Sequence, residues 1–278
     1  MTPPVRVGTA EALDGAVLSW RADGKGPALV CANGLGVSAV FWRKLAKHFA
    51  STHTVVTWDY RGYGRSPVPE HPEGVTIAQC ARDLWTVADR AGVGEAVLLG
   101  HSMGAQVCLE AYRVQPGRVR ALVPLLGIAG ASLPGGARLE PLLRVLLEVG
   151  AANAGLAEHA LRALVRAPGV WTALRALGIV HQDLEHPGAL DLRAYFALAR
   201  DLLSHDASSM LPEVRVPTLV IAGERDRFTP AERSREMAAQ IPGAELLVVR
   251  GGTHGALLEQ PELVALAVEK FLRVRGLA

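Results

Sequence analysis

The sequence predicts an α/β fold in which a mainly parallel sheet of eight strands is covered by helices on both faces. Short β-branched or aliphatic runs alternate with helical patterns along most of the chain. The runs are bounded by Gly, Pro or polar residues, as strands usually are. The helical patterns place apolar residues on one side and charges on the other, which is typical of helices that cover a sheet.

The eight strands are predicted from short apolar runs. The first two runs flank a turn at Asp14-Gly15, so we expect an antiparallel hairpin there. The other six follow at intervals that leave room for helical crossovers, which predicts parallel pairing. The runs are Val5–Thr9, Ala16–Arg21, Ala28–Ala32, Thr54–Trp58, Ala96–Leu99, Arg120–Leu126, Thr218–Ala222 and Glu245–Val249.

Five amphipathic helices are predicted between and after these strands. Thr76 and Thr229, the latter followed by Pro230, are predicted to begin two of them, because Thr and Pro are favoured at helix N-termini. The helices are Val40–Ala50, Thr76–Ala91, Met103–Gln115, Ala231–Gln240 and Pro261–Arg273.

The alternation stops between Gly130 and Pro212, where strand-like runs are replaced by helical patterns rich in Leu, Ala and Arg. We therefore predict that residues 130–212 form an inserted helical cap, whereas residues 1–129 and 213–278 form the core domain. The helices expected in the cap are Leu139–Val149, Leu156–Val165, Trp171–Leu177 and Leu190–Leu203.

Composition excludes several classes of function. The 29 Lys and Arg nearly balance the 27 Asp and Glu and form no basic stripe, so we expect no nucleic-acid partner. The longest uncharged run, Ala121 to Ala137, is short and contains two prolines, so we expect no membrane span. The first residues lack a signal peptide pattern, so we expect a cytoplasmic protein. The three cysteines form no C-x-x-C, and their odd number argues against a disulfide framework. We expect a monomer or homodimer.

The strongest local motif is Gly100-His101-Ser102-Met103-Gly104, between a predicted strand and a predicted helix. This strand-turn-helix context is that of a nucleophile elbow, whose sharp turn needs small residues two positions before and after the serine. Ser102 is therefore a candidate nucleophile. The Met103 N–H begins the helix and is suited to stabilise a developing negative charge.

Four further segments accompany this elbow: Asn33-Gly34-Leu35-Gly36, Asp59 to Ser66, Gly223 to Asp226 and Gly252 to Gly255. With them the chain resembles the α/β-hydrolases, and within these the serine-nucleophile branch of esterases, lipases and enol-lactonases. The resemblance implies a triad of Ser102, Asp226 and His254. It also implies that Leu35 and Met103 supply the two amides of an oxyanion hole.

The residues themselves favour the same base and leave two candidates for the acid. Imidazole accepts a proton near neutral pH, and His254 alone among the nine histidines lies just past a predicted strand in the C-terminal half of the core. His101 adjoins Ser102, but successive side chains of an elbow point in different directions. Glu224 competes with Asp226 for the role of the acid, and the family spacing G-x-x-D favours Asp226.

A rival motif lies in the same region. Residues 34–39 fit the G-x-G-x-x-[G/A] pattern, and Asp59 follows after the next strand, which is typical of dinucleotide binding. The preceding hairpin and the later elbow have no place in such a site, so we expect no cofactor. We also expect no metal, because no H-E-x-x-H occurs and His181 and His186 share no clear helix face.

One position departs from the common family pattern, since Asn33 stands where His usually precedes the oxyanion glycine. The resulting Asn-x-Leu-Gly form is similar to that of enol-lactone hydrolases, so lactones are possible substrates. Asp59 and Arg61 are interpreted as structural residues that hold their loop in place, and not as catalytic residues.

The sequence thus predicts a serine hydrolase that cleaves carboxylic esters of small or medium apolar molecules through an acyl-enzyme. Lactonase and carbon-carbon bond hydrolase activity remain alternatives, because the same triad serves both. A non-catalytic receptor that uses the fold to bind a small molecule is a rival from another class.

Overall fold

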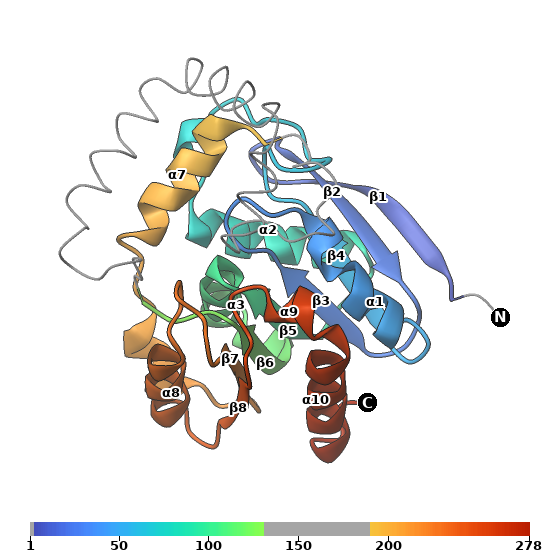
Figure 1. Cartoon of the computed structure of the whole chain (residues 1–278). Helices are drawn as coiled ribbons and strands as arrows, with labels where there is room; N and C mark the ends of the chain where they lie inside the picture. Colours follow the sequence, from blue (N-terminus) through green and yellow to red (C-terminus); the bar gives the residue numbers. More distant parts are fainter. Residues whose placement is uncertain (1–2, 131–189) are drawn as a thin grey trace, which may run out of the picture.

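The computed structural model describes residues 3–130 and 190–278, and these form one sheet of eight strands with helices around it (Figure 1). The strand order is β1-β2-β4-β3-β5-β6-β7-β8. Strands β1, β2 and β4 pair antiparallel, and all the other neighbours pair parallel. The predicted fold class is confirmed.

The strands lie where the apolar runs predict them, with small differences at their ends. The hairpin strands are longer than expected, because cross-strand pairing continues to Glu11 opposite Val17 and to Val5 opposite Asp23. The strands are β1 Val5–Glu11, β2 Val17–Asp23, β3 Ala28–Ala32, β4 Thr54–Trp58, β5 Ala96–His101, β6 Val119–Leu125, β7 Leu219–Gly223 and β8 Glu245–Val249.

The helices also follow the prediction, with one wrong start. Thr76 caps its helix by accepting a hydrogen bond from the Gln79 N–H, as expected. Thr229 does not begin α8, which starts at Ala231 after Pro230 without a side-chain cap. The α-helices are α1 Arg43–Phe49, α2 Ile77–Arg90, α3 Met103–Val114, α7 Leu192–Leu202, α8 Ala231–Gln240, α9 Ala256–Glu259 and α10 Pro261–Val274. The 3-10 turns are η1 Ala39–Trp42, η2 Pro72–Gly74, η3 Pro116–Arg118 and η5 Ser208–Glu213.

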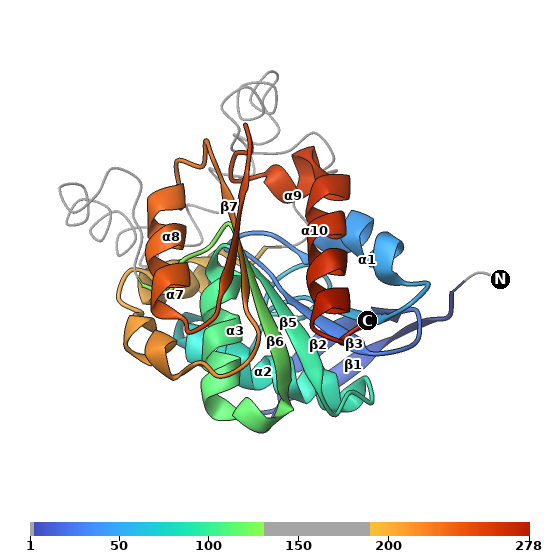
Figure 2. The same cartoon turned by 90° about the horizontal axis from the view of Figure 1, so that it is seen from below.

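The sheet separates two apolar cores. Helices α2, α3 and α8 cover one face, and α1 and α10 cover the other (Figure 2). Side chains of β5 alternate between the two, so that Leu98 belongs to the first core and Val97 and Leu99 to the second. The carboxyl ends of the parallel strands are thereby held between two packed layers.

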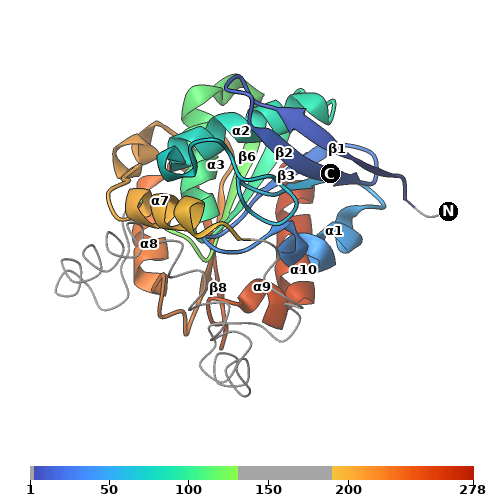
Figure 3. The ribbon, with the colours of Figure 1, turned by 90° about the horizontal axis from the view of Figure 1, so that it is seen from above.

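The predicted cap lies only partly within the described residues. Three of its four expected helices fall in residues 131–189, which lie outside them, and the fourth is present as α7. Helix α7 is joined to α2, because the Ile77 N–H donates to Asp201 Oδ2 at 2.7 Å, and the two helices lie side by side in Figure 3. The Tyr195 ring of α7 packs against Gly36 in the loop after β3.

Arg61 ties the loop after β4 to two other parts of the core. Its Nε and Nη2 donate to the two carboxylate oxygens of Asp83 on α2, at 2.6 and 2.7 Å, and its Nη1 donates to Asp14 in the hairpin turn. Arg61 and Asp83 are both buried. These contacts agree with the interpretation of Arg61 as a structural residue that holds its loop in place.

We expect Arg61→Met to lower the free energy of unfolding by about 3–5 kcal/mol, because it leaves the buried Asp83 carboxylate without its charged partner. Arg21→Met is the matched control. Arg21 pairs with Asp23 at the surface, with 46% of its side chain exposed, so its loss is expected to cost less than about 1 kcal/mol. Urea unfolding of both variants measures the difference, and equal losses would contradict the structural role of Arg61.

Candidate active site

Ser102 occupies a sharp turn between β5 and α3. Its backbone has φ 54° and ψ −121°, a strained conformation for a residue other than glycine. A Cβ on Gly100 would lie 2.2 Å from the Gly104 oxygen, and one on Gly104 would lie 2.1 Å from the Ala32 oxygen. Both glycines are therefore required by close backbone approach, as the elbow motif predicts.

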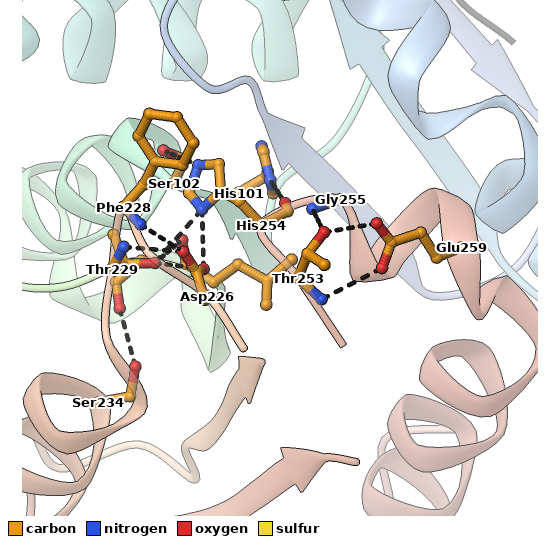
Figure 4. Close-up of polar contacts among 12 residues, drawn as sticks. His101, Ser102, Asp226, Phe228, Thr229, Ser234, Thr253, His254, Gly255 and Glu259 are labelled. Carbon is orange, nitrogen blue, oxygen red and sulfur yellow. Dashed lines mark hydrogen bonds and ion pairs between the residues drawn. The ribbon is translucent and has the colours of Figure 1, made fainter. Parts of the chain in front are cut away.

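The hydroxyl of Ser102 begins a chain of hydrogen bonds through His254 to Asp226 (Figure 4). His254 Nε2 lies 2.9 Å from Ser102 Oγ, and His254 Nδ1 lies 2.8 Å from Asp226 Oδ2. The three residues follow β5, β8 and β7, whose carboxyl ends meet at one edge of the sheet. An ionised carboxylate only accepts, so Nδ1 carries the imidazole proton and Nε2 can accept the proton of Ser102.

Asp226 is buried, and both of its oxygens accept hydrogen bonds. Oδ1 accepts from the backbone N–H groups of Phe228 and Thr229 at 2.8 and 2.9 Å. Oδ2 accepts from His254 and from the Thr229 hydroxyl, which lies at 2.7 Å. Burial alone raises the pKa of Asp226, but the hydrogen bonds from His254 and Thr229 outweigh it and lower the pKa. The carboxylate is therefore ionised at neutral pH.

Glu224, the competing acid, has a different environment. It is exposed, and its Oε2 accepts from the Gly251 N–H at 2.7 Å. The imidazole thus meets Asp226, the carboxylate that the G-x-x-D spacing favours.

His101 lies beside the site, and its hydrogen bond is to the His254 backbone and not to the Ser102 hydroxyl. Its Nε2 donates to the backbone oxygen of His254 at 3.2 Å, and its ring packs on Phe41. Burial lowers the pKa of His101 to about 3, and the neighbouring His254 acts in the same direction. His101 is neutral at physiological pH, so it supports the His254 loop without adding charge.

The two predicted oxyanion amides belong to segments next to Ser102. Met103 is the first residue of α3, where backbone N–H groups have no acceptor within the helix. Leu35 follows Gly34, and a Cβ on Gly34 would lie 3.2 Å from the Ser102 Cβ. The loop after β3 therefore runs close beside the serine.

Asn33 holds that loop in place. Its Nδ2 donates to the Trp58 oxygen at 2.7 Å, and its Oδ1 accepts from Trp42 Nε1 at 2.8 Å. Its backbone oxygen accepts from the Tyr60 hydroxyl at 2.8 Å. Asn33 is fully buried, so the amide that replaces the more common histidine anchors the start of the loop after β3.

Thr229 and Phe228 also surround Asp226, and the sequence motifs assign neither of them to the site. The Phe228 ring lies 5.1 Å from the His254 ring, centroid to centroid. A signal for both is their position two and three places after Asp226, because an Asp side chain often accepts from those N–H groups in a turn.

Asp59, the acidic residue of the dinucleotide-binding pattern, makes its hydrogen bonds within the core domain. Its carboxylate accepts from the N–H groups of Ala39 and Arg65 at 2.7 and 3.1 Å.

Among residues 3–130 and 190–278, no three His, Cys, Asp or Glu side chains lie close enough together to bind a metal ion. Over the same ranges, each helix is too short or too polar to cross a membrane.

Comparison with known proteins settles the family. A family model described as the alpha/beta hydrolase family matches residues 29–268. The chain belongs to the alpha/beta hydrolase family. The match includes the elbow, the loop after β3 and the loops that carry Asp226 and His254.

Relatives within the family are named for several activities. The putative carbamate hydrolase RutD of Azorhizobium caulinodans is 30% identical over 252 residues, which are 88% of this chain and 91% of that protein. A solved thermophilic esterase from Thermogutta terrifontis shares the fold, with a TM-score of 0.79 and 24% identity. The match covers 97% of this chain and 99% of the esterase chain. The solved Est816, described as an N-acyl homoserine lactone degrading enzyme, has a TM-score of 0.73 at 26% identity, covering 95% and 100%. Together these findings support hydrolase activity in general.

Proposed function

We propose that this alpha/beta hydrolase cleaves carboxylic esters of small or medium apolar molecules through an acyl-enzyme. The observation that carries the proposal is the 2.9 Å contact of Ser102 Oγ with His254 Nε2, continued to Asp226 at 2.8 Å. A serine hydroxyl is a poor nucleophile until a base within hydrogen-bond reach removes its proton. His254 meets that requirement.

In the first half-reaction, Ser102 Oγ attacks the ester carbonyl carbon while His254 Nε2 takes the hydroxyl proton. The backbone N–H groups of Leu35 and Met103 stabilise the oxygen anion of the tetrahedral intermediate. His254 then gives its proton to the leaving alcohol, and the acyl group stays on Ser102. In the second half-reaction, His254 activates a water molecule that releases the acid.

Asp226 supports both halves by fixing and stabilising His254. Its ionised carboxylate accepts the Nδ1–H and so leaves Nε2 facing Ser102. It also stabilises the imidazolium that forms in each transition state. Because the Asp226 side chain is buried, this interaction is weakly screened by solvent.

Two other substrate classes follow from specific observations. The 26% identical Est816 and the Asn33-Gly34-Leu35-Gly36 loop favour lactones, which are cyclic esters and need no new chemistry. The 30% identical RutD favours carbamates, whose nitrogen lone pair makes the carbonyl carbon less electrophilic. Carbon-carbon bond cleavage by the same triad is a further alternative.

The test is a panel of p-nitrophenyl esters of increasing chain length, with matched lactones and p-nitrophenyl carbamates. We expect the highest kcat/KM on esters, with a rise of about fourfold for each methylene that the apolar pocket buries. Ser102→Ala provides the control on every compound. Carbamates or lactones that outpace matched esters would move the proposal to those classes. A wild-type protein that neither turns over the panel nor reacts with a fluorophosphonate would be a receptor.

The proposal extends to the domain division and the cellular setting. We propose that residues 130–212 cap the core and shape the acyl pocket, and α7 supports this because its Tyr195 packs on Gly36 beside Leu35. A pocket shaped in this way is expected to take small molecules as substrates.

Cys31, Cys80 and Cys108 are buried and unpaired, which is typical of a reducing compartment such as the cytoplasm.

A further inference from the structure

The hydroxyl of Thr229 lies at the junction of the acid, the base and the sheet (Figure 4). Its Oγ1 is 2.7 Å from Asp226 Oδ2, 2.8 Å from the Leu126 backbone oxygen and 3.4 Å from His254 Nδ1. Thr229 is buried, so water does not compete for these contacts. We propose that Thr229 is a positioning residue that sets the orientation and basicity of Asp226; this rests on the proposed function.

The Thr229 hydroxyl serves two acceptors with a single proton. A hydroxyl has one proton to donate, and both the ionised Asp226 and the Leu126 carbonyl only accept. The two acceptors therefore share one donor. When the proton points to Asp226, it withdraws charge from the oxygen that also faces the imidazole. Thr229 thus tunes how strongly Asp226 holds a protonated His254.

The Thr229 hydroxyl also limits rotation of the Asp226 carboxylate. Two backbone N–H groups hold Oδ1, whereas Oδ2 is held by the Thr229 hydroxyl on one side and by His254 on the other. Without the hydroxyl, Oδ2 would depend on the imidazole N–H to hold it in place. The hydroxyl therefore keeps Oδ2 aimed at Nδ1 during the reaction, when His254 gains and loses a proton.

In the fold, the Thr229 hydroxyl contacts the site and does not cap the helix that follows it. A Thr before Pro230 is suited to cap a helix, yet α8 has no side-chain cap. Leu126, directly after β6, has φ 50°, which is unfavourable for a branched residue, and its N–H is fixed by the Ile221 oxygen at 2.7 Å. Its carbonyl accepts from Thr229, so the loop after β7 is linked to the end of β6 at the acid itself.

The test compares Thr229→Val, which keeps the shape but loses the hydroxyl, with Thr229→Ser, which retains it. We expect Thr229→Val to lower kcat about 10- to 100-fold with little change in KM, because Asp226 Oδ2 is no longer held toward His254 Nδ1 and a small misplacement is costly in the transition state. The pH profile of kcat/KM is also expected to change, because an unshared Asp226 carboxylate attracts the imidazolium more strongly. Thr229→Ser is expected to restore both.

A measurement without substrate separates this proposal from the proposed function. Proton NMR detects the His254 Nδ1–H, and its resonance is expected to shift in Thr229→Val and to return in Thr229→Ser. Absence of ester turnover in the wild type, with this pattern intact, would overturn the function but leave the coupling of Thr229 to the pair. If Thr229→Val does not fold, Thr229→Ala takes its place.

Three results would overturn the positioning role. The first is a folded Thr229→Val with the kcat, pH profile and NMR signal of the wild type. The second is a loss of thermal stability with an unchanged pH profile, which indicates a structural role alone. The third is equal impairment of the valine and serine variants.

Discussion

Ser102→Ala is expected to lower kcat by about 10⁴-fold or more, while leaving the melting temperature close to that of the wild type. The substitution removes the one oxygen that the proposed reaction acylates. Its effect on folding is small, because Ser102 is partly exposed and its hydroxyl is engaged by His254 rather than by the apolar core. Ester turnover and thermal unfolding of the purified variant test both expectations.

Covalent labelling gives the same prediction a second readout. Intact-mass analysis after fluorophosphonate treatment is expected to show one adduct on the Ser102 peptide of the wild type and none in Ser102→Ala. Ser38→Ala is the control, because Ser38 lies between β3 and η1 and its side chain makes no cap hydrogen bond for η1. This variant is expected to keep the adduct on the Ser102 peptide. An adduct on another residue, or full activity of Ser102→Ala, would remove Ser102 from the mechanism.

The elbow is predictable because the residues that it requires fall within one short motif. Gly100 gives clearance from the Gly104 oxygen in the same turn, and Gly104 gives clearance from the Ala32 oxygen at the end of β3. The strands are predictable for a similar reason, since the alternation of Leu98 with Val97 and Leu99 follows from their two apolar faces. Pattern alone does not fix the order in which strands pair, so the position of β4 between β2 and β3 is known only from the structure.

The surroundings of the acid are harder to predict, because they depend on contacts between distant segments. Thr229 has the sequence context of a helix start, and its actual partners include Leu126, which lies 103 residues earlier. In the sequence, the choice between Glu224 and Asp226 depends on family spacing. In the structure, burial separates them, since Asp226 is enclosed against His254 and Glu224 is exposed.

Asp226→Asn is expected to lower kcat by about 10⁴-fold, whereas Glu224→Gln is expected to change it by less than about threefold. The amide introduced by Asp226→Asn carries no charge to stabilise the imidazolium, and it permits the tautomer with the proton on Nε2, which cannot accept from Ser102. Both substitutions remove one negative charge from the same loop, so the difference between them isolates the contact with His254. Steady-state kinetics at neutral pH provides the comparison.

The stability of Asp226→Asn relative to the wild type depends on pH in a way that checks the environment of Asp226. Because the folded protein lowers the pKa of Asp226, its ionised carboxylate stabilises the fold above the unfolded-state pKa of about 3.9. That contribution is lost as the pH falls through the lower pKa of the folded state. Asp226→Asn is therefore expected to be less stable than the wild type at neutral pH, with a deficit that shrinks in acid. Should Glu224→Gln prove the inactive variant while Asp226→Asn keeps its activity, Glu224 would be the acid, and the carboxylate held by Phe228, Thr229 and His254 would have a structural role.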